Sequence, residues 1–126
     1  VSKAILANRN NLRKIVKIVH LEIRKKMNIF IKKNKNKKII ILDIPLLLEN
    51  KINKKNDVLI FVKSKRSEIL KRLKNRESFN KKLLNEFKNI QLPLDYKKKK
   101  SQFIIKNKFN EKSVKNSIQY ILKTIL

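Results

Sequence analysis

Two arginines four positions apart, Arg72 and Arg76, are the side chains of this sequence best suited to bind phosphate. Residues at this spacing face the same way on a helix, and planar guanidinium groups match phosphate oxygens better than the ammonium group of lysine does. The other cations of the chain are mostly lysines. The pair therefore indicates phosphate chemistry; the alternative is an ordinary solvated helix face, because exposed charges are the norm.

His20 is the only histidine, and histidine is the side chain most suited to proton transfer near neutral pH. The sequence has no cysteine and no HExxH pattern, so His20 predicts no metal site. Without cysteine the chain also has no disulfide and no thiol nucleophile, which fits a cytoplasmic location. No apolar run approaches the roughly 20 residues that span a bilayer, so we expect no membrane partner.

Glycine is absent from the sequence. Loops that cradle phosphate need glycine because their backbone approaches the phosphates closely and adopts positive φ. No such loop exists within these residues. The sequence also begins at Val1 rather than at methionine, and we therefore expect that it is a truncated form of a longer protein.

The formal net charge is +26, from 35 Lys and Arg against 9 Asp and Glu. A field of this sign favours anionic partners: nucleic acid, a membrane surface or a polyphosphate. The excess is mostly lysine interleaved with asparagine and isoleucine, a bias away from average usage that an AT-rich genome produces on any solvated surface. Charge alone therefore does not choose the partner. At 126 residues, one small domain is expected.

Three short apolar runs predict strands. Residues 39–42 are β-branched for most of their length and are followed by an aspartate and a proline, which favours a strand buried on both faces of a parallel sheet. Residues 57–62 repeat this signature and lead through Ser64, the expected N-cap, into a helical stripe. Residues 103–105 form the third run. A strand followed by a helix is the unit of an α/β fold.

Apolar residues at helical spacing predict the remaining elements. A stripe over residues 12–31 fits either one long bent helix or two helices that meet near His20. Ser78 is expected to cap a further helix, and Pro93 to open a short one. From Asn110 onward the last stripe predicts a terminal amphipathic helix.

Five short motifs follow one another from about Asn8 to the carboxyl terminus. They are LRKIVKIVHLEI with His20, IPLLLEN with Pro45 and Glu49, LKRLKNR with Arg72 and Arg76, QLPLDYK with Lys97, and SQFIIKN with Asn107. In order and spacing they resemble the dephospho-CoA kinase family. Leu21 stands where that family usually has proline, and Gln102 where it usually has aspartate.

The resemblance implies an α/β fold, a partial P-loop NTPase fold of the nucleoside-monophosphate kinase type. Its three layers place helices on both sides of parallel strands, and the first two strands would be absent from this chain. Residues 1–126 would form a single partial domain. Its parts would be a helical acceptor (CoA) subdomain at 8–37, core strands and a helix at 38–75, a lid-like helical region at 76–101, and the last strand with the C-terminal helix at 102–126.

The activity that the resemblance implies is transfer of the γ-phosphoryl group of ATP, with Mg²⁺, to the ribose 3′-hydroxyl of dephospho-CoA. Such a transfer depends on positioning and charge neutralisation. The resemblance gives phosphate stabilisation in the lid to Arg76 and Arg72, and ATP binding to Arg76, Asn107 and Lys97. It gives acceptor binding to His20, Asp43, Pro45, Leu46, Leu47 and Glu49.

Several of these assignments leave a plainer alternative open. Asp43 either helps to hold Mg²⁺ through water or only ends its strand. Asn107 either contacts the base or is a turn residue after its strand. Leu46 and Leu47 are wall and core residues rather than chemical groups. The family places its general base on an aspartate outside this sequence, so His20 is interpreted as a positional residue.

Two other functions compete with the kinase. A basic helical protein could bind nucleic acid through lysines such as those at 97–100, although the buried-strand runs and the 6% aromatic content do not favour it. Another kinase of the same type could act on a different acceptor. Because two strands and the phosphate loop would be missing, we expect the chain alone to be poorly stable and not to phosphorylate dephospho-CoA.

Overall fold

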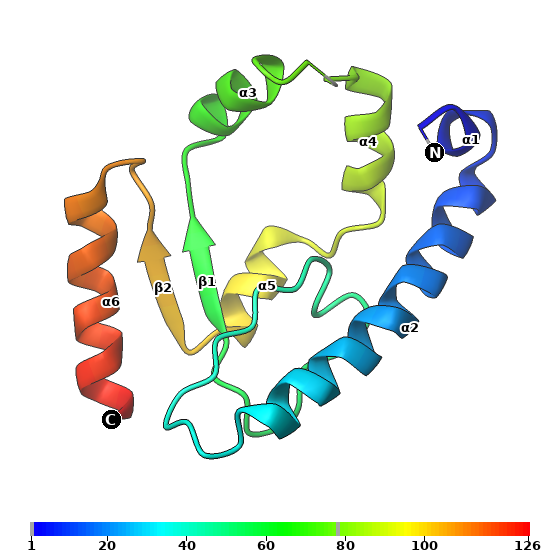
Figure 1. Ribbon diagram of the computed structural model, residues 1–126. Coiled ribbons are helices and arrows are strands. Elements are labelled where there is room, and N and C mark those ends of the chain that lie inside the picture. Colours follow the sequence, from blue (N-terminus) through cyan, green and yellow to red (C-terminus); the bar gives the residue numbers. More distant parts are fainter. Residues whose placement is uncertain (1, 78) are drawn as a thin grey trace. The chain divides into compact units, whose positions relative to one another are not determined.

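The computed structural model describes residues 2–77 and 79–126 (Figure 1). Within them lie six helices and two strands, in the order α1, α2, β1, α3, α4, α5, β2, α6. The described chain is therefore a mixed α/β protein, as the sequence predicts. It divides into two compact units: Val1–Asn53 with Lys81–Gln91, and Lys54–Asn80 with Leu92–Leu126.

The sheet of the second unit is a parallel pair of strands, β1 (Ile60–Lys63) and β2 (Phe103–Lys106), which run side by side in Figure 1. Ile60 lies opposite Phe103 in the register. Parallel pairing is what the short, β-branched runs predict, because such strands read as continuous apolar segments rather than alternating ones. The second and third predicted strands are thus confirmed, with bounds shifted by at most three residues.

The last helix, α6 (Glu111–Ile125), packs against β2. Ile105 on β2 and Ile121 on α6 are both buried. Asn110 caps the helix, since its side-chain oxygen accepts a hydrogen bond from the backbone N–H of Ser113 at 2.8 Å. The predicted terminal amphipathic helix and its starting point are therefore confirmed.

Replacing Asn110 with alanine should lower the free energy of unfolding of the second unit by about 1 kcal/mol, because the first turn of α6 loses an acceptor for its free N–H groups. Urea denaturation followed by circular dichroism measures this. Lys115→Ala, at an exposed position within the same helix, is the matched control and should change the value by less than about 0.5 kcal/mol. Equal losses in the two variants would contradict the capping role.

Two further helices belong to the second unit. α5 (Leu94–Lys100) begins directly after Pro93, as predicted. α3 (Arg66–Lys74) follows β1, but its N-cap is Lys65 and no side chain caps it, so the assignment of Ser64 as the cap is wrong. The chain enters the helix one residue later than predicted, so Ser64 stands outside the capping position. Ser78, the expected cap of the next helix, lies outside the described residues.

The first unit is built on one long helix, α2 (Arg9–Lys33), accompanied by α1 (Ser2–Ala7) and α4 (Lys81–Asn89). The side chain of Asn8 caps α2. α1 packs against both α2 and α4. Of the two forms that the apolar stripe allows, the single long helix is the one observed. The buried apolar side chains of this unit are Ile5, Leu12 and Ile52.

Residues 39–42 do not form a strand, so the first of the three strand predictions is wrong. Ile41 is 82% exposed, whereas a strand covered on both faces would bury it. A strand needs a neighbour to accept and donate its backbone hydrogen bonds. Among the described residues, β1 and β2 pair only with each other, and nothing supplies that neighbour to residues 39–42.

Burial of β1 on both faces is also not observed. Ile60 and Val62 are exposed, and Phe61 between them is half-buried. Within the described residues the chief neighbour of β1 is β2, while α6 packs on β2. β1 therefore lies in a run predicted to be a strand and pairs in the predicted parallel direction, but its two faces are not both buried. The division of residues 1–126 into parts of a single domain stays a prediction.

Candidate functional site

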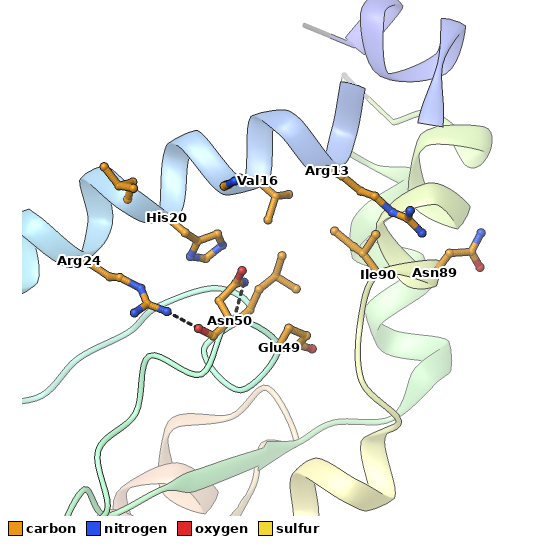
Figure 2. Close-up of a pocket in the computed structure, with 11 residues that line it drawn as sticks. Arg13, Val16, His20, Arg24, Glu49, Asn50, Asn89 and Ile90 are labelled. Carbon is orange, nitrogen blue, oxygen red and sulfur yellow. Dashed lines mark hydrogen bonds between the residues drawn. The ribbon is translucent and has the colours of Figure 1, made fainter. Parts of the chain in front are cut away.

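A pocket of about 600 Å³ lies in the first unit (Figure 2). One wall is a face of α2, a second is the turn at residues 46–50, and the third is the carboxyl end of α4. This volume is within the usual range for small-molecule sites. Outside α2, the lining residues are Leu46, Glu49, Asn50, Asn89 and Ile90.

The α2 wall combines three cations with a buried imidazole. Arg13, Lys17, His20 and Arg24 follow one another at intervals of four, three and four residues, which places them on one face of a helix. Arg13, Lys17 and Arg24 are exposed, so their charged ends remain hydrated at the mouth of the pocket. The helical period of α2 is thus what gathers these groups.

His20 is only 6% exposed, and its Nδ1 atom is buried without a hydrogen-bond partner among the described residues. Figure 2 shows the ring pointing from α2 toward the turn that contains Asn50. Buried polar atoms in proteins are almost always hydrogen-bonded, because leaving one unpaired costs its desolvation. His20 therefore lines the pocket and keeps a buried hydrogen-bonding atom that no described residue engages.

The turn opposite α2 is strained and held by hydrogen bonds. Leu46 has a φ of 55°, a left-handed conformation that costs a non-glycine residue about 1–2 kcal/mol. The backbone N–H and the side-chain amide of Asn50 both donate to the Leu46 carbonyl, at 3.1 and 2.9 Å. Arg24 donates to the carbonyl of Asn50, a bond drawn in Figure 2. The arginine thus ties the turn to α2.

The structure brings together part of the acceptor set that the resemblance implies. His20, Leu46 and Glu49 line the pocket, although they come from two separate motifs. Asp43 and Pro45 are exposed and do not line it, and Leu47 is half-buried outside the lining. The half-buried state of Leu47 fits the wall-or-core alternative.

Sequence reasoning missed most of the polar lining. Arg13, Lys17, Arg24, Asn50 and Asn89 were not singled out, yet all five line the pocket. The spacing of the three cations relative to His20 was the available signal for the α2 wall. No comparable signal exists for Asn89, which reaches the pocket through the fold of the unit.

The residues to which the resemblance gives ATP binding belong to the second unit, and one of them, Asn107, lies where both strands end. Asn107 directly follows β2; its backbone N–H donates to the carbonyl of Lys63 at 2.8 Å, and its side chain accepts from the N–H of Phe109 at 2.7 Å. Phe109 has a φ of 58°. The guanidinium carbon of Arg72 lies 4.1 Å from the centre of the Phe109 ring, a cation–π contact. Arg72 and Asn107 therefore meet around one loop.

Arg76 and Lys97 take no part in that cation–π contact. Arg76 lies two residues beyond α3 and is exposed. Lys97 lies on α5 and is half-buried, and its carbonyl accepts a hydrogen bond from the Ser101 hydroxyl at 2.9 Å. The roles that the resemblance gives to these two residues stay predictions.

One carboxylate of α2 is engaged away from the pocket. Lys25 donates a hydrogen bond to Glu22 at 2.9 Å, and this bond together with the charge of Lys25 lowers the pKa of Glu22. Neither residue lines the pocket. Glu22 is thus ionised near neutral pH and pairs with a lysine outside the pocket lining.

The described residues hold no group of three or more His, Asp or Glu side chains that could bind a metal ion. Asp43, for which a water-mediated contact with Mg²⁺ was one of two alternatives, is exposed and belongs to no such group. None of the described helices combines the length and the apolar character needed to cross a bilayer.

Comparison with known proteins gives one consistent result. The family model for dephospho-CoA kinase matches residues 1–113. Dephospho-CoA kinase from Wolbachia pipientis wMel is 31% identical over 99% of this chain and 65% of its own length. The enzyme of the Wolbachia of Brugia malayi is 29% identical with the same coverage. That of Bacillus anthracis is 30% identical over 98% of this chain and 62% of its own length.

The chain spans 65% of the length of the two Wolbachia relatives and matches them over nearly all of its own length. The family model covers most of the sequence, including the α2 face, the turn at residues 46–50 and the strand ends. On this evidence the chain belongs to the dephospho-CoA kinase family.

Proposed function

We propose that this chain carries the acceptor-binding and lid parts of a dephospho-CoA kinase, which transfers the γ-phosphoryl group of ATP to the ribose 3′-hydroxyl of dephospho-CoA. One observation carries the proposal. His20, from one family motif, shares a pocket with Leu46 and Glu49 from the next motif. Two motifs that are separate in the sequence thus contribute to one pocket. This supports an acceptor site, because the resemblance gives acceptor binding to residues of both motifs.

The second unit supplies the ATP side in this proposal. Asn107 follows a strand at its carboxyl end, where open α/β sheets place their ligands. There the adenine ring lies beside Asn107, and Arg76 and Lys97 bind phosphate oxygens. Arg72 is held over Phe109 and shapes the loop that receives the base.

The proposal includes the finer fold, a P-loop NTPase fold of the nucleoside-monophosphate kinase type. In the whole enzyme, residues 39–42 pair with a strand that this sequence does not contain, and the exposed Ile41 becomes covered. Mg²⁺ enters with ATP, and no step is assigned to it here. The cysteine-free composition fits a cytoplasmic location.

Calorimetric titration of the 1–126 chain tests the proposal. Dephospho-CoA should bind with a Kd in the range of typical KM values, about 1 μM to 1 mM. The chain alone should not turn over, because a glycine-free sequence offers no phosphate-binding loop. A chimera, in which the part of the Wolbachia pipientis relative that this chain does not span is joined ahead of Val1, should form CoA from ATP and dephospho-CoA.

The rival function is nucleic-acid binding, which the net charge of +26 favours. It predicts DNA binding that is indifferent to sequence and weakens steeply with salt, without affinity for dephospho-CoA. The same titration with a DNA duplex at two salt concentrations distinguishes the two. Binding of DNA together with no detectable binding of dephospho-CoA or ATP would overturn the kinase proposal.

A further inference from the structure

The pocket in the first unit has the charge of an anion site. Three of its lining side chains, Arg13, Lys17 and Arg24, are cations, and Glu49 is the carboxylate among the lining residues. The cations are exposed and Glu49 is half-buried. A pocket with this imbalance attracts a ligand that carries more than one negative charge.

The cations are also spread along the pocket. Each helical residue advances about 1.5 Å, so Arg13 and Arg24 are separated by about 16 Å along the axis of α2, with Lys17 between them. The three residues are thus too far apart along the helix for their Cα atoms to surround a single phosphate, although their long side chains bring the charged ends closer together. Two linked phosphates present more charged oxygens to these three cations than a single phosphate does.

His20 adds a buried polar side chain to this row of cations. It lies between Lys17 and Arg24 on the same face of α2, and its Nδ1 is buried without a partner among the described residues. When Nδ1 carries the ring proton, it donates a hydrogen bond, and a phosphate oxygen is a strong acceptor. No described residue accepts a hydrogen bond from it, and His20 lines the pocket, so a ligand held in the pocket is a candidate partner.

We propose that this pocket binds the diphosphate group of a phosphorylated organic ligand. Arg13, Lys17 and Arg24 bind its phosphate oxygens, and His20 Nδ1 donates a hydrogen bond to one of them. Arg24 already donates to Asn50, and the remaining donors of its guanidinium serve the ligand. The identity of the ligand rests on the proposed function, since dephospho-CoA carries a diphosphate; free inorganic pyrophosphate shares the same chemistry.

The charge arm of the test uses calorimetric titration of the 1–126 chain at constant ionic strength, with inorganic pyrophosphate, dephospho-CoA and phosphate-free pantetheine as probes. The triple variant Arg13→Ala, Lys17→Ala, Arg24→Ala should lower the affinity for pyrophosphate and for dephospho-CoA at least about 10-fold. The control triple variant removes three exposed cations of α2 that do not line the pocket, and it should stay within about twofold of the parent. Its substitutions are Lys14→Ala, Lys26→Ala and Lys32→Ala.

The histidine arm measures stability and affinity together. His20→Leu should weaken pyrophosphate by about 10-fold, while its urea midpoint stays equal to or rises above that of the parent, because an unpaired buried polar atom is removed. His20→Asn, whose amide puts a donor near the position of Nδ1, should retain more affinity than His20→Leu. A lower midpoint with unchanged affinity in both variants would show a purely structural histidine and overturn its part in the site.

The two proposals can fail separately. If dephospho-CoA binds and its affinity is the same for the pocket triple variant as for the control triple variant, the diphosphate site is wrong and the kinase proposal stands. If pyrophosphate binding depends on Arg13, Lys17 and Arg24 but dephospho-CoA binds no better than pyrophosphate, the anion site stands and the acceptor assignment fails. Equal loss of pyrophosphate affinity in the pocket and control variants would show that only the net charge attracts the anion.

Discussion

Turnover of the chimera should fall by about 100- to 1000-fold when Arg76 is replaced by alanine. In phosphoryl transfer the negative charge on the moving group spreads over its oxygens, and the enzyme lowers the barrier mainly by neutralising that charge. A guanidinium that binds these oxygens in the transition state affects kcat. The KM for ATP should therefore change by no more than about threefold.

The local geometry favours Arg76 over Arg72 for this role. The backbone of Arg76 is fixed after α3, since its N–H donates to the Leu73 carbonyl at 3.2 Å and its carbonyl accepts from Phe79 at 2.9 Å. Its side chain is exposed, whereas the guanidinium of Arg72 lies over the Phe109 ring. Arg76 is thus anchored at the backbone with its cation available to a ligand.

Two variants make the test specific. Arg76→Lys should recover part of the lost kcat, because it restores the charge but not the planar, bidentate contact. Arg66→Ala, which removes an exposed arginine at the start of the same helix, should leave kcat within about twofold. If Arg76→Ala behaves like Arg66→Ala in an active chimera, the proposed role of Arg76 is wrong.

Local sequence signals predicted the second unit better than the first. Asn110 and the stripe after it were enough to place α6, because a cap and a helical period depend only on nearby residues. The strand at residues 39–42 failed for the opposite reason. β-Branched residues favour a strand mainly because they pack well against neighbouring strands. Among the described residues, no strand pairs with residues 39–42.

The site was predictable only where residue type was informative. His20 was noticed as the only histidine, and Glu49 through its motif, and both line the pocket. Arg13 and Lys17 were overlooked because cations are abundant in a chain with 35 Lys and Arg. Their spacing from His20 on α2 was present in the sequence. However, only the position of the turn at residues 46–50 shows that this face of the helix lines the pocket.

Leu12→Ala should lower the free energy of unfolding of the first unit by about 2–5 kcal/mol, the usual range for removing a buried leucine side chain and leaving a cavity. Leu12 is 1% exposed and is the largest fully buried side chain among the described residues. Small units are stabilised by only about 5–15 kcal/mol in total. The loss is therefore a large part of what holds α2 in place, and urea denaturation followed by helix content measures it.

Ile18→Ala is the matched control, because Ile18 lies on the same helix and is 67% exposed. It should change the free energy of unfolding by less than about 0.5 kcal/mol. Leu12 does not line the pocket, although its neighbour Arg13 does. While Leu12→Ala remains folded at low temperature, its affinity for pyrophosphate should therefore match that of the parent. A stable variant would show that Leu12 is not the core of this unit, and a folded variant with weakened binding would show that packing of α2 also positions the cations.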